Sequence, residues 1–131
     1  MRNKQMILVV DDDPDCIEFA RVTLSPRYEV RTALSTKQCR LELQARKPDL
    51  ILLDVMMAHL CEGLDMTREL KENAATRDIP VIMLTSVNET YDYSTQIEKS
   101  FFPHDRWLDK PVQPEVLMKA VQDVLGDSDG E

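Results

Sequence analysis

The chain has 131 residues, of which 43% are hydrophobic and 31% charged, a composition typical of one soluble globular domain with its own core. Its 24 acidic and 16 basic residues give a formal net charge of −8, which argues against a nucleic-acid-binding surface because phosphate contacts require clustered Lys and Arg. No apolar run approaches the roughly 18 residues of a membrane helix, and we expect residues 1–5 to lead into a strand and not into a signal-peptide core. The cysteines lack metal-ligand spacing, so we expect reduced thiols and a cytoplasmic location.

The amino-terminal part is predicted to form a strand, a helix, a strand and a helix. Met6–Val10 is an aliphatic run typical of a strand buried on both faces. Pro14 suits the first turn of a helix, with Asp13 available as its N-cap. Tyr28–Thr32 alternates apolar and polar residues as an edge strand does, and Thr36–Arg46 has a weak apolar stripe at helical spacing.

The third predicted strand, Leu50–Asp54, consists of four aliphatic residues followed by a carboxylate. A strand-terminal aspartate can simply cap the next helix or start a turn. At the carboxyl end of a buried parallel strand, however, it also lies where open α/β sheets place their ligand crevices.

The carboxyl-terminal part continues the alternation of strands and helices. A loop from Val55 to Glu62 is expected first. The remaining predicted elements, in chain order, are a helix from Gly63 to about Asn73, a strand at Ile79–Leu84, a segment of poor helical propensity at Asn88–Phe101, a short strand at Asp105–Leu108 and a helix from Pro114 to Gly126.

Five strand–helix alternations predict an α/β fold, a doubly wound five-stranded parallel sheet with helices on both faces. We expect a single domain at residues 1–125 and an acidic C-terminal tail at residues 126–131.

Polar residues of complementary chemistry follow four of the predicted strands. Because all carboxyl ends of a parallel sheet point to one edge, we expect Asp11, Asp12, Asp54, Thr85 and Lys110 to share a crevice. Clustered carboxylates repel unless a cation lies between them, and oxygen ligands favour Mg²⁺. A lysine and a hydroxyl are suited to phosphoryl oxygens. Each of these polar residues alone can be a helix cap or an ordinary loop residue, but their occurrence at the ends of four different strands indicates a binding site.

These segments resemble the receiver domain of two-component response regulators over about residues 5 to 125. The residues that carry the resemblance are Ile7 to Pro14, Pro48 to Met57, Asp78 to Ser86 and Lys110-Pro111. The resemblance implies a flavodoxin-like strand order 2-1-3-4-5 and a single-domain regulator in a phosphorelay.

The resemblance also implies residue roles. Asp54 is expected to be the phosphoacceptor for a histidine kinase or phosphotransfer protein. Asp12 is expected to bind Mg²⁺ directly and Asp11 mainly through water, with the backbone carbonyl of Met56 as a further ligand. Val87 and Met56 offer no group that orients water, so we expect self-catalysed phosphoacceptance with slow autodephosphorylation and no other enzymatic activity.

The implied switch involves Thr85, Lys110 and the aromatic residue Trp107. Thr85 and Lys110 are expected to contact the phosphoryl group, and Trp107 to move into space vacated behind Thr85. This movement would change the surface of the fourth helix, fifth strand and fifth helix. That surface is expected to bind a downstream protein, in a monomer or weak homodimer.

Two segments depart from the family pattern. The loop at residues 58–62 is one residue longer, with Ala58 in place of the usual proline, and the segment at residues 87–106 is also longer than usual. Neither departure removes an expected phosphorylation residue.

Two other functions fit parts of the same pattern. A small haloacid-dehalogenase-like phosphatase also has an Asp-x-Asp motif after a strand, but it leaves Asp54 without a role and lacks a late acidic pair. A receiver-shaped adaptor could bind a partner without phosphorylation, although it would not need the acidic, hydroxyl and lysine set.

Overall fold

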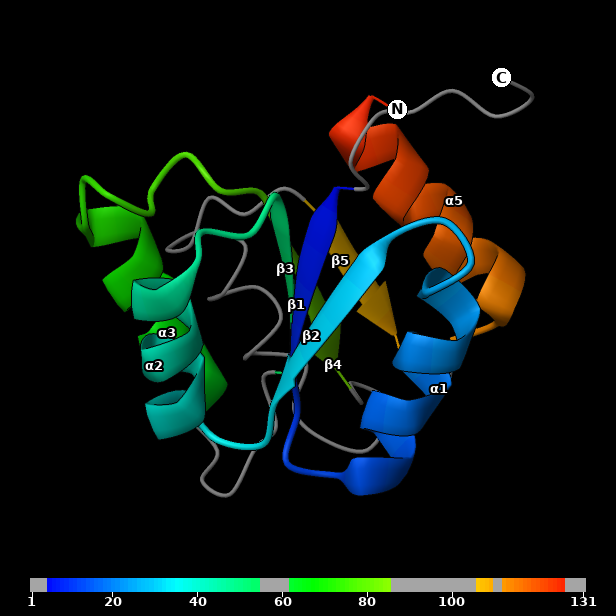
Figure 1. Cartoon of the computed structure of the whole chain (residues 1–131), viewed down its shortest axis with the longest axis horizontal. Helices are drawn as coiled ribbons and strands as arrows, with labels where there is room; N and C mark the ends of the chain where they lie inside the picture. The colour runs from blue at the N-terminus through cyan, green and yellow to red at the C-terminus, as the bar shows by residue number, and fades with distance from the viewer. Residues whose placement is uncertain (1–4, 55–61, 86–105, 110–111, 127–131) are drawn as a thin grey trace.

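The computed structural model describes residues 5–54, 62–85, 106–109 and 112–126, and shows the expected doubly wound fold (Figure 1). Five parallel strands lie in the order β2-β1-β3-β4-β5. The strands are β1 (Met6–Val10), β2 (Glu29–Ala33), β3 (Leu50–Asp54), β4 (Val81–Thr85) and β5 (Arg106–Asp109). The helices are α1 (Pro14–Leu24), α2 (Thr36–Ala45), α3 (Glu62–Glu72) and α5 (Pro114–Leu125). The segment of poor helical propensity at Asn88–Phe101 and the tail at 127–131 lie outside the described residues.

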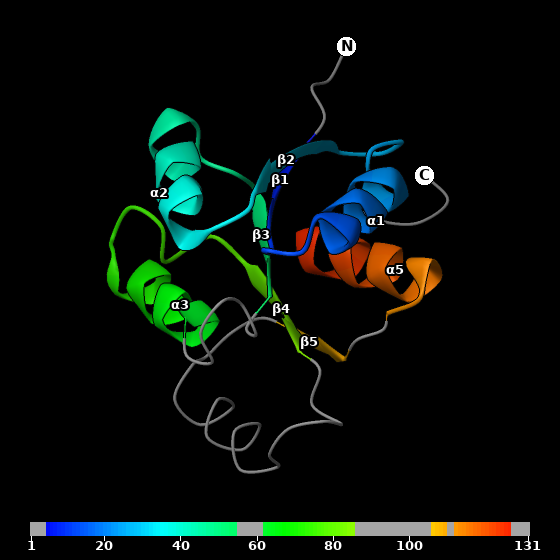
Figure 2. The same ribbon diagram turned by 90° about the horizontal axis from the view of Figure 1, so that it is seen from below.

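The sheet separates two hydrophobic cores, and the helices cover both of its faces (Figure 2). Alternate residues of a strand point to opposite faces, so Leu8 and Val10 pack on the side of α2 and α3, whereas Ile7 and Val9 pack on the side of α1 and α5. The central strands β1 and β3 are buried at every position. Within the described ranges, no helix is long and apolar enough to cross a membrane.

Several element boundaries differ from the sequence predictions. The strand expected at Tyr28–Thr32 begins at Glu29, because the Tyr28 amide donates to the Leu24 carbonyl (2.9 Å) in the turn that ends α1. The strand expected from Ile79 begins at Val81, since the Ile79 amide donates to Thr76 (3.0 Å) and Pro80 has no N–H. The strand expected at Asp105–Leu108 is Arg106–Asp109, in parallel register with β4.

Helix boundaries also differ by one residue, including the start of α3 and the end of α2. Glu62, expected to end a loop, is the first residue of α3. Arg46, expected to be the last residue of the second helix, is extended and serves as the C-cap of α2.

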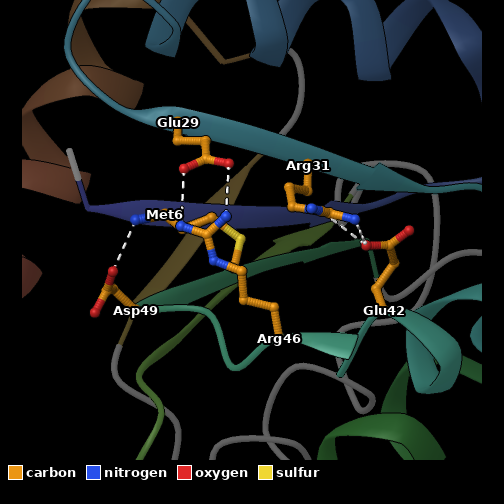
Figure 3. A network of polar contacts seen from close by, with 6 residues as sticks. All are labelled: Met6, Glu29, Arg31, Glu42, Arg46 and Asp49. Atoms are coloured by element: carbon orange, nitrogen blue, oxygen red, sulfur yellow. Dashed lines mark hydrogen bonds and ion pairs between the residues drawn. The ribbon is translucent and has the colours of Figure 1, made fainter. Parts of the chain in front are cut away.

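The edge strand β2 is joined to α2 by two ion pairs (Figure 3). Arg46 Nη2 lies 2.9 Å from Glu29 Oε1, and Arg31 Nη2 lies 2.7 Å from Glu42 Oε1. Residues two apart on a strand are separated by about 6.7 Å and residues four apart on a helix by about 6 Å, so the two charge spacings match. These pairs supplement the weak apolar stripe of α2, in which Cys39 is fully buried and Leu43 partly so.

Candidate metal centre at the carboxyl edge of the sheet

Two buried carboxylates lie side by side where β1 and β3 end. Val10 pairs with Leu53 in the parallel register, which brings Asp11 next to Asp54. Asp11 is 2% exposed and Asp54 is 3% exposed, whereas Asp12 is exposed. Carboxylate oxygens of all three residues lie within 4.8 Å of one another. The structure therefore brings together the three acidic residues that the strand-end argument grouped.

The turn between β1 and α1 orients Asp11. The Asp11 amide donates to the Ala33 carbonyl (3.1 Å), and Asp11 Oδ1 accepts a hydrogen bond from the Asp13 amide (3.0 Å). Asp13 is the N-cap of α1, as the sequence predicted, and its side chain accepts from the Asp15 amide (2.9 Å). The strand-end pattern does not predict the hydrogen bond from the Asp13 amide to Asp11. The signal that could have revealed it is the position of Asp11 in a turn, where an aspartate side chain often accepts from the backbone amide two residues on.

This donor set suits a hard divalent cation. Three carboxylates within 4.8 Å offer only oxygen ligands, and two of them are removed from water, so their mutual repulsion favours binding of a positive charge. Mg²⁺ takes one or two carboxylates directly and keeps several waters, which agrees with a cluster that is buried on one side and exposed at Asp12.

The other sequence-predicted site residues are described less completely. Thr85 is the last residue of β4, one position beyond the Leu84–Asp54 pair, so its backbone lies on the strand next to Asp54. Trp107 pairs with Met83 in the sheet register. Met56 and Lys110 lie outside the described residues, as do the loop 58–61 and the segment 86–105.

Comparison with known proteins gives a match over most of the chain. The family model described as the response regulator receiver domain matches residues 7–122. The phosphate regulon transcriptional regulatory protein PhoB of Pseudomonas aeruginosa is 37% identical over 120 residues, which are 91% of this chain and 51% of that protein. The alkaline phosphatase synthesis transcriptional regulatory protein PhoP of Bacillus subtilis is 30% identical over 91% of this chain and 48% of that protein. The chain thus spans about half the length of these curated relatives.

Solved structures agree with this match over nearly their full length. The chemotaxis protein CheY4 of Vibrio cholerae superposes with a TM-score of 0.80 at 30% identity, covering 92% of this chain and 98% of that one. A putative response regulator from Chloroflexus aurantiacus gives a TM-score of 0.83 at 26% identity, covering 95% and 99% of the two chains.

Proposed function

Because this chain belongs to the response regulator receiver domain family, we propose that Asp54 accepts a phosphoryl group from a histidine kinase or a phosphotransfer protein in a phosphorelay. The observation that carries the proposal is the position of Asp54, which ends the central strand β3, is 3% exposed and shares a 4.8 Å cluster with Asp11 and Asp12. The cytoplasmic location and the kinase partner are parts of the same proposal.

In the proposed reaction the Asp54 carboxylate is the nucleophile. An oxygen of Asp54 attacks the phosphorus of a phosphohistidine, the new O–P bond forms, and the N–P bond breaks. The leaving imidazole nitrogen keeps the electron pair of that bond and takes up a proton. Strand β3 is buried at every position, so its end holds the nucleophile on a rigid element.

The three carboxylates would hold Mg²⁺, with Asp12 as a direct ligand, Asp11 acting mainly through water, and the Met56 carbonyl completing the protein ligands. When bound, Mg²⁺ supplies positive charge that stabilises the transferring phosphoryl group. Because the Asp11 and Asp54 side chains are buried, bulk water has little access to their side of the acidic cluster.

The remaining expected roles complete the proposal. Thr85 donates a hydrogen bond to a phosphoryl oxygen, and Lys110 pairs with the acyl phosphate. Trp107, on the edge strand β5, reports the switch by changing position when Thr85 moves. The output is binding of a downstream protein at the surface of the segment 88–101, β5 and α5, in a monomer or in a weak homodimer through the same surface. Apart from this transfer and slow autodephosphorylation, the chain catalyses nothing.

Phosphopeptide mapping tests the proposal directly. Treatment with acetyl phosphate and Mg²⁺ should add one phosphoryl group, and mass spectrometry should locate it at Asp54. Asp54→Asn and chelation of Mg²⁺ should each abolish labelling. Asp78→Asn, which removes an exposed carboxylate from the α3–β4 connection, should be labelled normally.

Two outcomes would contradict the proposal. Sustained release of p-nitrophenol from p-nitrophenyl phosphate would support the phosphatase alternative. An unlabelled protein that still binds its partner would support the phosphorylation-independent adaptor.

A further inference from the structure

Asp13 is exposed and follows Asp11 and Asp12 in the chain, but its side chain accepts hydrogen bonds from the first turn of α1. Asp13 Oδ1 accepts from the Asp15 amide at 2.9 Å, and Asp13 Oδ2 accepts from the Cys16 thiol at 3.5 Å. Both carboxylate oxygens are thus engaged by donors in the first turn of α1. The side chain acts as a helix cap.

The backbone amide of Asp13, unlike its side chain, bonds to a residue of the acidic cluster. Its amide donates to Asp11 Oδ1 at 3.0 Å, while its carbonyl accepts from the Ile17 amide at 3.1 Å. The same residue therefore begins α1 and holds one oxygen of a carboxylate that is 2% exposed. The direction of that amide depends on the path of the chain into α1, which the side-chain cap fixes.

We propose that Asp13 is a positioning residue for the metal centre, which aligns the Asp11 carboxylate through its backbone amide and is not itself a metal ligand. This inference rests on the proposed function, because it concerns the Mg²⁺ site of that function. Hydrogen bonds that orient ligand groups typically change metal affinity by about 10-fold to 100-fold when they are lost.

The comparison of Asp13→Asn with Asp13→Ala isolates the capping contribution. Both variants remove the same negative charge, but asparagine caps a helix about as well as aspartate, whereas alanine does not. In titration calorimetry of the unphosphorylated chain with MgCl₂, Asp13→Ala should raise the Kd about tenfold. Asp13→Asn should stay within about threefold of the unmodified protein, because an exposed charge contributes little.

Ser35→Ala provides a matched control for loss of stability. Ser35 is the N-cap of α2, and its hydroxyl accepts a hydrogen bond from the Gln38 amide at 3.1 Å. None of the hydrogen bonds described for Ser35 involves the acidic cluster. This variant should lose stability toward urea to an extent similar to Asp13→Ala and keep its Mg²⁺ affinity.

Each contrary result has a distinct meaning. Equal Kd values for Asp13→Asn and Asp13→Ala overturn the inference, because Asp13 would then act by charge, as a ligand, or not at all. A weakening in Ser35→Ala as large as that in Asp13→Ala also overturns it. If the unmodified chain shows no saturable Mg²⁺ binding, the metal site of the proposed function itself fails.

Discussion

Replacing Asp54 with asparagine is expected to stabilise the metal-free protein. The substitution removes one of three charges whose oxygens all lie within 4.8 Å. Asparagine has nearly the same size and keeps one carbonyl oxygen as a hydrogen-bond acceptor. The relief of repulsion between Asp54 and the other two carboxylates should therefore exceed the cost of losing one carboxylate oxygen as an acceptor.

The size of the effect follows from burial and distance. Two unit charges at the 4.8 Å limit of this cluster repel by ~3.5 kcal/mol at an effective dielectric constant of ~20 and by ~0.9 kcal/mol in water. The interaction of Asp54 with buried Asp11 approaches the first value, and that with exposed Asp12 the second. Because the metal-free site relaxes and takes up counterions, we expect Asp54→Asn to raise the free energy of unfolding by about 1–3 kcal/mol, less than the full repulsion.

Urea unfolding with EDTA and with Mg²⁺ measures this prediction. In EDTA, Asp54→Asn should have the higher free energy of unfolding. In Mg²⁺ the unmodified protein should gain about 1.4 kcal/mol at tenfold excess over Kd, and the variant less, so the difference narrows. Asp78→Asn should change neither measurement. A variant no more stable than the unmodified protein in EDTA, or one with the same gain from Mg²⁺, would refute the electrostatic argument.

Three further predictions concern other parts of the molecule. Burial raises the pKa of the Cys39 thiol to about 12, so the free energy of unfolding should fall as the pH rises from the ordinary thiol pKa toward that value. Iodoacetamide should label Cys39 only in urea, and labelling of the folded protein would contradict this. The hydrogen bonds from Arg40 lower the pKa of Glu69. A double-mutant cycle on this exposed pair should give a coupling free energy of about 0.2–1 kcal/mol at neutral pH, which disappears as the pH falls through the lowered pKa. A coupling free energy that persists in acid would contradict this. Gly126→Ala should cost about 1 kcal/mol in urea unfolding, since φ is 71° and no atom lies within 4 Å of an added Cβ; an unchanged stability would show that the helix end relaxes freely.

The order and type of the described elements could be predicted because β1, β3 and β4 are compact aliphatic runs and β2 alternates apolar and polar residues. Leu50–Asp54 and Met6–Val10 match the observed β3 and β1 residue for residue. Boundaries set by hydrogen bonds to other elements or turns could not be predicted from these patterns. Tyr28 has a strand-like side chain, yet its amide bonds to Leu24, and only the folded turn reveals that competition.

The ion pairs of β2 and α2 show a different limit. The spacing of Glu29 and Arg31 suits one face of a strand, and that of Glu42 and Arg46 suits one face of a helix. The pairing of Glu29 with Arg46, together with that of Arg31 with Glu42, requires that α2 run antiparallel to β2. The sequence contains both spacings, but other acidic and basic residues have the same spacings, so proximity had to come from the fold.

The acidic cluster differs from these ion pairs because topology alone brings it together. Parallel strands end at one edge, so Asp11 and Asp54 must meet there once β1 and β3 are neighbours. The alignment of their carboxylates is a separate matter, since it depends on the turn after β1, where the Asp13 amide holds Asp11 Oδ1. Residue types at strand ends can therefore predict that a cation binds, while the affinity of the site depends on backbone hydrogen bonds that strand patterns do not encode. This division explains why a helix cap can matter for metal binding without contributing a ligand.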